Sequence, residues 1–438
     1  MIGGGRTAGS GKAVLLALGG MTALAAGLGV GRFVYTPILP AMVEGMGLSK
    51  AEAGLIASVN FIGYLAGALL AAAPRLPGSR RSWLLGALAL SAMTTGAMGL
   101  VSSLPAFLAL RCAGGAASAF VLVFASALVL DRLAHAGRSA LSALHYAGVG
   151  VGIALSAALV STLLAAGAGW RVLWLASGAV LLALLAAVAW LVPGGDPPRE
   201  ATASPPNVGG GNPRHGLAAL AWAYGLFGFG YVVTATFLVT IVRADPEIRS
   251  VEPLVWVVVG VAAAPSVALW TRLGTWLGVA RVFAAACLVE AAGVVASVLW
   301  PTVAGALLAA ALLGGTFMGI TALGFAGARQ LAAGGDPRRT LGLLTAAFGA
   351  GQIAGPAFAG FLYDETGGFV LPSLLAAGAL LAAAATVLRV RLPTAAATDG
   401  RQMSPLETRD GAVSGPAPVE QSRPGTQPRP LGKSDWRR

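Results

Sequence analysis

Long apolar runs separated by short polar breaks repeat along the whole chain. Each run approaches the ~20 residues that a helix needs to cross the ~30 Å hydrocarbon layer of a bilayer. We therefore expect an all-α membrane protein. The pattern predicts twelve transmembrane helices, at about 14–36, 53–73, 82–101, 106–130, 140–165, 171–192, 217–242, 253–271, 279–300, 302–329, 340–363 and 369–390.

One internal break is much longer than the others and divides the predicted helices into two sets of six. This segment, 193–216, reads PGGDPPREATASPPNVGGGNPRHG, and such Pro and Gly content is typical of a linker. Two short basic segments, PRLPGSRRSWLLG after the second helix and WTRLGTWLGVARVF after the eighth, occupy equivalent places in the two halves. An internal repeat of this kind predicts two six-helix bundles related by a pseudo-two-fold axis.

The same pattern sets the domain boundaries. Residues 392–438 lose the apolar runs and are rich in Pro, Gly, Ser, Thr and Arg, so they cannot bury enough surface to fold alone. We expect a short cytoplasmic N-terminal segment, a first bundle, a cytoplasmic linker, a second bundle and a disordered cytoplasmic tail, at 1–13, 14–192, 193–216, 217–391 and 392–438.

Basic residues are distributed unevenly between the two sets of loops. The set that includes both termini holds sixteen Lys and Arg residues near the helix ends, whereas the other set holds four: Lys50, Arg171, Arg243 and Arg249. Because positive charge favours the cytoplasmic side, both termini are predicted to lie in the cytoplasm. The high Ala, Gly and Arg content is typical of a GC-rich bacterium, so the bacterial cell (inner) membrane is the expected location.

The composition excludes several classes of protein. Hydrophobic residues make up 56% of the chain, charged residues 11%, and the mean hydropathy is +0.78. This chain is more apolar and less charged than a soluble globular protein. The net charge of +12 comes from loops and the tail and forms no basic helix face, so nucleic-acid binding is not expected. Cys112 and Cys287 both fall inside predicted helices, which leaves no disulfide framework or metal site.

No enzyme signature is present either. The chain has no GxxxxGKS/T nucleotide loop, no HExxH and no GxSxG. We expect no catalytic activity and no cofactor, and a monomer whose partners are the lipid bilayer and a small-molecule substrate.

Four segments carry a resemblance to a known family. They are GRFVYTPILPAMVEGMGLSKAEAG at 31–54, HYAGVGVGIALS at 145–156, YGLFGFGYVVTATFL at 224–238 and FGAGQIAGPAFAGFLYDETGG at 348–368. The sequence resembles the major facilitator superfamily and, within it, the uncharacterised YbfB/YjiJ-type transporters. The resemblance implies the major facilitator fold, alternating access between the two halves, and a central cavity lined by the first, fourth, seventh and tenth helices.

Two arginines are the leading candidates for a substrate site. Arg32 is predicted near the outer end of the first helix and Arg111 near the outer start of the fourth, at similar depths. Both helices line the cavity that the resemblance implies, so the two guanidinium groups could converge on an anionic substrate. The alternative is that each side chain snorkels to the outer headgroups.

Neutral polar and aromatic residues complete the candidate site. They suit a mostly apolar pocket with a few hydrogen-bonding groups, although packing explains aromatic residues equally well. The candidates besides the arginines are Tyr35, Asn60, Tyr64, Tyr231, Thr234 and Gln352.

Two buried titratable residues are candidates for proton coupling. Glu290 falls near the centre of the ninth helix, where a bare charge is costly, and His145 begins the fifth. The alternatives are a neutral Glu290 bonded to a neighbouring helix and a histidine with an ordinary interfacial role.

Glycines four residues apart recur in several predicted helices, as at Gly63 and Gly67 or Gly148 and Gly152. Such pairs let helix backbones approach closely, either as sliding contacts during transport or as static packing.

Taken together, these features predict a secondary active transporter that moves a small solute across the cell membrane, driven by a solute or proton gradient. The substrate expected from the arginines is a small organic anion. The alternatives are efflux of amphipathic or drug-like compounds and, in another class, a membrane sensor or scaffold that does not transport.

Overall fold

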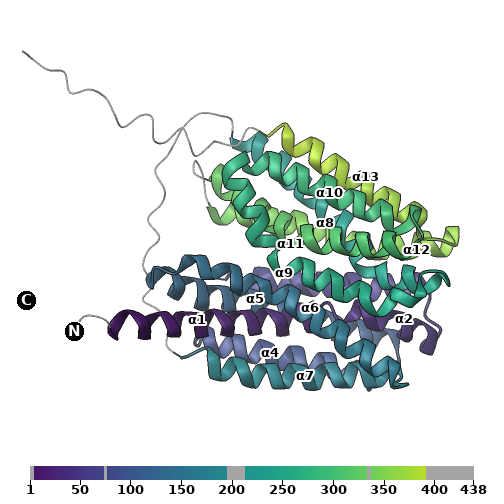
Figure 1. Cartoon of the computed structure of the whole chain (residues 1–438), viewed down its shortest axis with the longest axis horizontal. Helices are drawn as coiled ribbons and strands as arrows, with labels where there is room; N and C mark the ends of the chain where they lie inside the picture. Colours follow the sequence, from purple (N-terminus) through teal and green to yellow (C-terminus); the bar gives the residue numbers. More distant parts are fainter. Residues whose placement is uncertain (1–3, 74–75, 195–212, 333–336, 391–438) are drawn as a thin grey trace, which may run out of the picture. The chain divides into compact units, whose positions relative to one another are not determined.

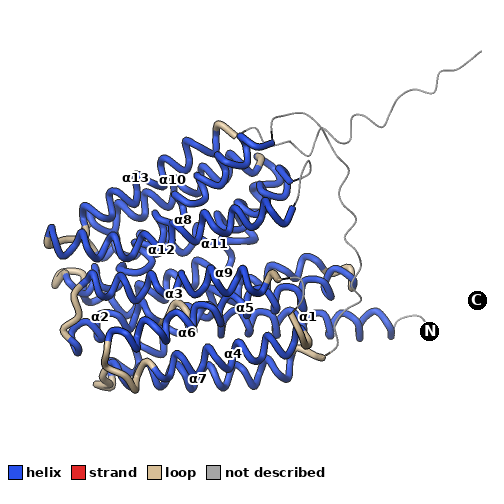
Figure 2. The backbone as a smooth tube through the Cα atoms, turned by 180° about the vertical axis from the view of Figure 1, so that it is seen from behind, coloured by secondary structure: helices blue, strands red, loops and turns tan. Residues whose placement is uncertain are grey.

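The computed structural model describes residues 4–73, 76–194, 213–332 and 337–390. All regular structure in these ranges is helical (Figures 1 and 2). The α-helices are α1 Gly4–Leu24, α2 Tyr35–Met46, α3 Lys50–Ala71, α4 Arg80–Ala97, α5 Leu104–His135, α6 Ser142–Ala165, α7 Trp170–Leu191, α8 Pro213–Ala244, α9 Glu252–Leu277, α10 Val279–Leu299, α11 Val303–Ala332, α12 Pro337–Thr366 and α13 Val370–Leu388. The predicted tail at 392–438 and most of the predicted linker at 193–216 lie outside the described residues.

Within the described ranges, eleven helical segments are long and apolar enough to cross a membrane. The twelfth predicted span corresponds to α4, whose 18 residues begin with Arg80 and Arg81 and include Ser and Thr side chains that lower its hydropathy. Because α4 packs against α5 and α7, it is part of the same bundle as its neighbours. Large apolar side chains face outward around the described helices, among them Trp190 and Trp222, which is expected of a surface in contact with lipid.

The first span differs from its prediction. It runs from Gly11 to Met46, about ten residues beyond the expected end, and combines α1, a π-helical segment at Ala25–Val30 and α2. The amide of Gly31 bonds to the carbonyl of Ala26 and that of Phe33 to Leu28, five residues back in each case. The expectation that Arg32 lies near the outer end of this span was therefore wrong, because the helix continues through Tyr35 and Pro40.

Helices α1 to α7 pack mainly on one another, and α8 to α13 do the same, which gives the two bundles (Figure 1). Three helix pairs join the halves: α3 with α12, α6 with α9, and α2 with α8. Small residues permit the closest approaches between halves. A Cβ added to Gly54 would lie 2.1 Å from the carbonyl oxygen of Pro356, and one added to Gly150 would lie 2.4 Å from the amide nitrogen of Ala264.

The glycine pairs singled out in the sequence are used differently. Gly63 and Gly67 pack against Cys112 and Ala116, and Gly148 packs against Met21, so each of these contacts lies within one bundle. They correspond to static close packing. The contacts that bring the two halves together involve other glycines.

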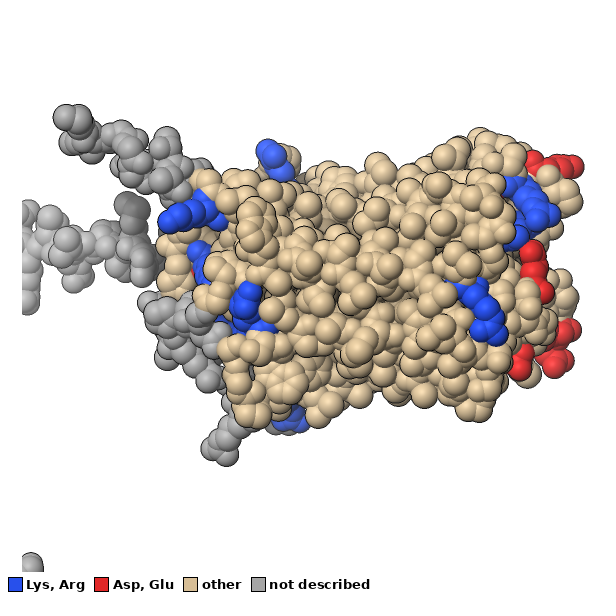
Figure 3. Space-filling model, turned by 90° about the horizontal axis from the view of Figure 1, so that it is seen from below, with Lys and Arg blue, Asp and Glu red and all other residues tan. Residues whose placement is uncertain are grey.

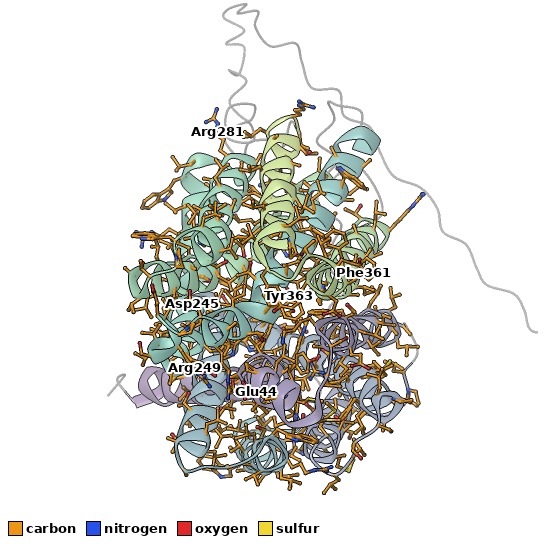
Figure 4. All side chains as sticks on the ribbon, turned by 90° about the vertical axis from the view of Figure 1, so that its right-hand side faces the viewer. Glu44, Asp245, Arg249, Arg281, Phe361 and Tyr363 are labelled. Carbon is orange, nitrogen blue, oxygen red and sulfur yellow. The ribbon has the colours of Figure 1, made fainter. Side chains whose placement is uncertain are left out.

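Polar contacts between the halves gather toward one end of the helices. Arg243 at the end of α8 meets Glu44 of α2 with two nitrogen–oxygen distances of 2.9 Å and also donates to Glu252 at 3.2 Å. The Thr36 hydroxyl donates to the carbonyl oxygen of Ala235 at 2.7 Å. Figure 4 looks onto this end, with Glu44 and Asp245 labelled. On the face shown in Figure 3, acidic side chains appear only at this end.

Candidate binding site

The two candidate arginines lie together inside the first bundle. Arg32 occupies the turn between the π-helical segment and α2, and Arg111 lies on α5. The Nη2 atom of Arg111 donates to the carbonyl oxygen of Arg32 at 3.2 Å, and the Nδ2 atom of Asn60 donates to the carbonyl oxygen of Arg111 at 2.8 Å. Three helical spans are thus tied together at this point.

Glycines explain why this arrangement can form. A Cβ on Gly29 would lie 2.4 Å from the Cα atom of Gly152, so the π-helical segment touches α6 backbone to backbone. The π-turn changes the hydrogen-bond register of the first span and leaves the Arg32 carbonyl free to accept from Arg111. Local π-turns in long helices are often found at functional sites.

Both guanidinium groups are buried against aromatic rings. Arg32 is 6% exposed and Arg111 5%, so neither side chain snorkels to the surface. The guanidinium carbon of Arg32 lies 4.3 Å from the ring centre of Tyr64 and 4.5 Å from that of Phe61. The guanidinium carbon of Arg111 lies 4.9 Å from the ring centre of Tyr35. Cation–π contacts of this kind stabilise a desolvated cation without neutralising it.

The positive charge of this pair is not balanced by an acid. Among the residues that the structure describes, neither Arg32 nor Arg111 forms an ion pair with Asp or Glu. The Nε and Nη2 atoms of Arg32 and the Nε atom of Arg111 are buried and have no hydrogen-bond partner. The site can therefore accept an anion through donors that are already desolvated.

The second bundle contributes an aromatic cluster. The Tyr231 ring lies nearly parallel to Phe317, at 5.7 Å and 8°, and to Phe348, at 5.9 Å and 6°. Gln352 donates from Nε2 to the Tyr231 hydroxyl. The Phe33 ring meets Phe317 edge to face at 5.9 Å, so the cluster joins the two halves beside Arg32.

Tyr231 links this cluster to the arginines, because it lies close enough to Arg32 to interact with its charge. Thr234 is buried one turn further along α8, with an Oγ1 atom that has no partner. The Tyr35 hydroxyl donates to the Ala53 carbonyl at 2.7 Å, and the face of the Tyr35 ring packs against the guanidinium group of Arg111. Tyr231 of the second half and Arg32 of the first half therefore lie near each other.

The two proton-coupling candidates lie in different surroundings. Glu290 is fully buried on α10, and neither carboxylate oxygen has a hydrogen-bond partner. The Thr316 hydroxyl on α11 lies close enough to interact with this carboxyl group, and it donates its own proton to the Leu312 carbonyl at 2.6 Å. Glu290 also interacts electrostatically with Tyr231, which interacts with Arg32 as well.

His145 belongs to another part of the first bundle. Its Nε2 atom lies 3.1 Å from the Ser126 hydroxyl, and its ring packs against Gly20 and Tyr146. None of these contacts leads to the arginine pair. Within the described ranges, no group of three His, Cys, Asp or Glu residues is arranged to hold a metal ion.

Four phenylalanines at the site were missed from the sequence: Phe33, Phe61, Phe317 and Phe348. Phe33 and Phe61 each follow a polar candidate directly, which is a usable signal. Phe317 and Phe348 lie in apolar stretches with no such neighbour, so only the packing of α8, α11 and α12 reveals them.

Comparison with solved structures places this fold among transporters. The nucleoside transporter NupG is 14% identical, with a TM-score of 0.61 over 86% of this chain and 98% of that one. A bacterial homologue of the human lysosomal transporter Spinster, solved in an inward-facing and occupied conformation, is 16% identical, with a TM-score of 0.62 over 86% of this chain and 95% of that one. At these identities the likeness concerns the fold.

A search of functionally curated proteins found no match. A family profile described as "Uncharacterised MFS-type transporter YbfB" matches residues 24–388, which include helices α2 to α13 and every candidate residue above. The chain therefore belongs to the YbfB family of transporters in the major facilitator superfamily.

Proposed function

We propose that this secondary transporter carries a small organic anion, which binds to Arg32 and Arg111 where the two bundles meet. The family and the fold support the general function, a secondary transporter in a membrane. The substrate class rests on the chemistry of the site.

The observation that carries the proposal is the pair of buried arginines without an acidic partner. A single Arg near the centre of a membrane helix costs about 2.5–3.5 kcal/mol on insertion scales, and two neighbouring cations also repel each other. Cation–π contacts offset part of this cost. An anion held by the free nitrogens would offset much of the rest, which gives the site affinity for negative charge.

The contacts between the halves support alternating access. Ion pairs and hydrogen bonds join the bundles at the end that carries Glu44 and Asp364, and the uneven distribution of Lys and Arg favours this end as the outer one. On that orientation both termini are cytoplasmic, the outer end is closed, and opening it requires these contacts to separate. The high Ala, Gly and Arg content supports the bacterial inner membrane as its location.

Proton coupling through Glu290 is part of the proposal. A fully buried carboxyl group with no partner is most stable as the neutral acid, and it can carry a proton when the surroundings change. Its electrostatic contact with Tyr231 offers a route by which anion binding at Arg32 could affect that proton.

One observation favours efflux of amphipathic compounds as a second candidate. The rings of Tyr224, Phe227, Tyr231 and Phe348 stack on one another in the second bundle, and such a surface binds apolar cations as readily as it lines an anion site. The two candidates differ in the charge of the ligand.

Thermal unfolding of the detergent-purified protein separates them. Small carboxylates, phosphates, amino acids and hydrophobic cations would be screened, because a ligand at 100 times its dissociation constant stabilises the folded state by about 2.7 kcal/mol. We expect an anion to stabilise the protein, and Arg32→Ala and Arg111→Ala to lose that effect. Arg281→Ala is the matched control, because Arg281 is exposed and lies away from the site (Figure 4).

Uptake of the stabilising anion into proteoliposomes completes the test. Both variants should lose uptake while remaining folded, and the control should keep it. Unchanged uptake in Arg32→Ala and Arg111→Ala would exclude the anion site, and stabilisation by hydrophobic cations alone would favour efflux.

A further inference from the structure

Arg32 presents one complete hydrogen-bonding edge to the site. Its Nε and Nη2 atoms are buried without a hydrogen-bond partner, and in a guanidinium group the N–H bonds of these two atoms run parallel along one edge. This edge matches the two oxygens of one carboxylate and forms the paired contact that makes Arg–carboxylate recognition specific. The Nη2 atom of Arg111 holds the Arg32 carbonyl, and its Nε atom is buried without a hydrogen-bond partner.

The surfaces next to this edge are flat. The Arg32 guanidinium lies 4.3 Å from the ring centre of Tyr64, so a ligand held by the edge is within reach of that ring. Across the site, Phe348 lies nearly parallel to Tyr231, at 6°, and to Phe227, at 18°. Tyr64 and Phe348 are only partly buried, whereas Tyr231 is buried behind them.

We propose that the substrate is a flat carboxylate, an aromatic or conjugated acid, whose carboxylate binds the Nε and Nη2 edge of Arg32 and whose planar body lies against Tyr64 and Phe348. This inference rests on the proposed anion transport and narrows it to one shape. Arg111 adds positive charge and fixes the Arg32 backbone, and the planar body extends the existing stack of rings.

Two physical arguments favour this shape. One free edge serves one carboxylate, whereas a phosphate presents three oxygens and is suited to a larger set of donors. A planar ring stacked on an aromatic face gains about three- to tenfold in affinity beyond the area that it buries. A saturated ring of similar size buries as much apolar surface but cannot stack.

A calorimetric titration of the full-length protein in detergent with matched probe compounds tests the inference. Benzoate is compared with cyclohexanecarboxylate, which has the same charge and a puckered ring, with benzamide, which is flat and uncharged, and with phenylphosphonate. We expect benzoate to bind at least threefold more tightly than cyclohexanecarboxylate and at least tenfold more tightly than benzamide.

The outcomes separate this inference from the proposed function. Equal binding of the two carboxylates would leave an anion site but overturn the flat shape. Tighter binding of phenylphosphonate than of benzoate would overturn the carboxylate. Equal binding of benzoate and benzamide, or no binding of any probe, would overturn this inference and count against anion transport as well.

Two variants test which residue binds the carboxylate of the ligand and which binds its planar body. Arg32→Lys keeps the charge and loses the paired edge, so benzoate affinity should fall at least tenfold. Phe348→Leu should abolish the preference for benzoate over cyclohexanecarboxylate and leave carboxylate binding in place. Phe358→Leu is the matched control, because Phe358 lies on the same helix, is 37% exposed and contacts Phe229 instead. A preference that survives in Phe348→Leu, or full affinity in Arg32→Lys, would overturn the assignment.

Discussion

The carboxylate of Asp364, near the end of α12, caps the helix that begins at Lys50 in the other half of the protein. It accepts from the backbone amides of Lys50 at 3.1 Å and Ala51 at 2.9 Å. Within the first bundle, Ser49 and Glu52 form a capping box: the Ser49 amide donates to the Glu52 carboxylate, and the Glu52 amide donates to the Ser49 hydroxyl. All four amides at this helix start are therefore satisfied, two of them only while the halves stay together.

Asp364→Asn should weaken closure of this end. The variant keeps an acceptor but loses a negative charge at a helix N-terminus, which is worth about 0.3–1 kcal/mol. The ratio of open to closed protein should therefore rise about two- to fivefold. The measurement is the rate of maleimide labelling of a cysteine introduced at Thr36, which is buried between the halves, with Cys112 and Cys287 replaced by Ala.

Glu365→Gln provides the control for Asp364→Asn. Glu365 is the exposed neighbour of Asp364. Labelling should be unchanged in this variant, and equal labelling rates in the two variants would contradict a specific role for Asp364.

The ion pair of Arg243 with Glu44 should act independently of the Asp364 cap. The two contacts share no hydrogen bond, and the Lys50 ammonium group is the charge that interacts with both Asp364 and Glu44. The effects of Glu44→Gln and Asp364→Asn on the labelling rate should therefore multiply in the double variant once added salt screens that charge. Because Glu44 is largely exposed, its own effect should be small, at most about 1 kcal/mol, and should shrink as salt is added. A double variant no faster than Asp364→Asn alone would show that the two contacts form one unit.

These contacts also mark the limit of what the sequence predicts. The helical spans follow from apolar runs, and the pairing of Arg32 with Arg111 was predicted from their similar depths on two helices that the family resemblance places at the cavity. The Asp364 cap could not be predicted, because an Asp near a helix end is equally consistent with solvent exposure, and its partners are more than three hundred residues away. The depth of Arg32 was missed because the apolar pattern was taken to end at residue 36, whereas the span continues to Met46.

The aromatic side of the site shows the same limit. Tyr231 and Gln352 were identified as polar residues in apolar helices, and the structure brings them together. Phe317 and Phe348 carry no such mark, since a phenylalanine in a membrane helix usually faces lipid or a neighbouring helix. Only the arrangement of three helices from the second bundle places their rings beside Tyr231.

Two glycines on α3 should respond differently to the same substitution. A Cβ on Gly54 would lie 2.1 Å from the Pro356 carbonyl oxygen in the other half, whereas one on Gly63 would lie 1.9 Å from the Cys112 carbonyl oxygen in its own half. Gly54→Ala should therefore separate the halves and speed the labelling at position 36. Gly63→Ala should lower the thermal stability of the first bundle by about 1–3 kcal/mol through overpacking.

Gly86→Ala is the control for these glycine variants, because nothing lies within 4 Å of a Cβ at that position. The added methyl group should leave both labelling and stability close to their original values or raise stability slightly, as Ala favours helix. Faster labelling in Gly63→Ala without loss of stability would contradict the division between packing and gating glycines.

Glu290→Gln should separate proton coupling from binding. The amide has nearly the shape of the neutral acid but cannot release a proton, so accumulation of substrate against its gradient should be lost. Exchange of labelled for unlabelled substrate across proteoliposomes requires no net proton movement and should persist.

His145→Gln is the comparison, because His145 contacts Ser126 and Gly20 rather than the aromatic cluster, and accumulation should survive in this variant. Loss of accumulation in His145→Gln alone would assign the proton-coupling role to His145 instead of Glu290. Loss of exchange in Glu290→Gln would show that the carboxyl group is needed for the transport cycle itself.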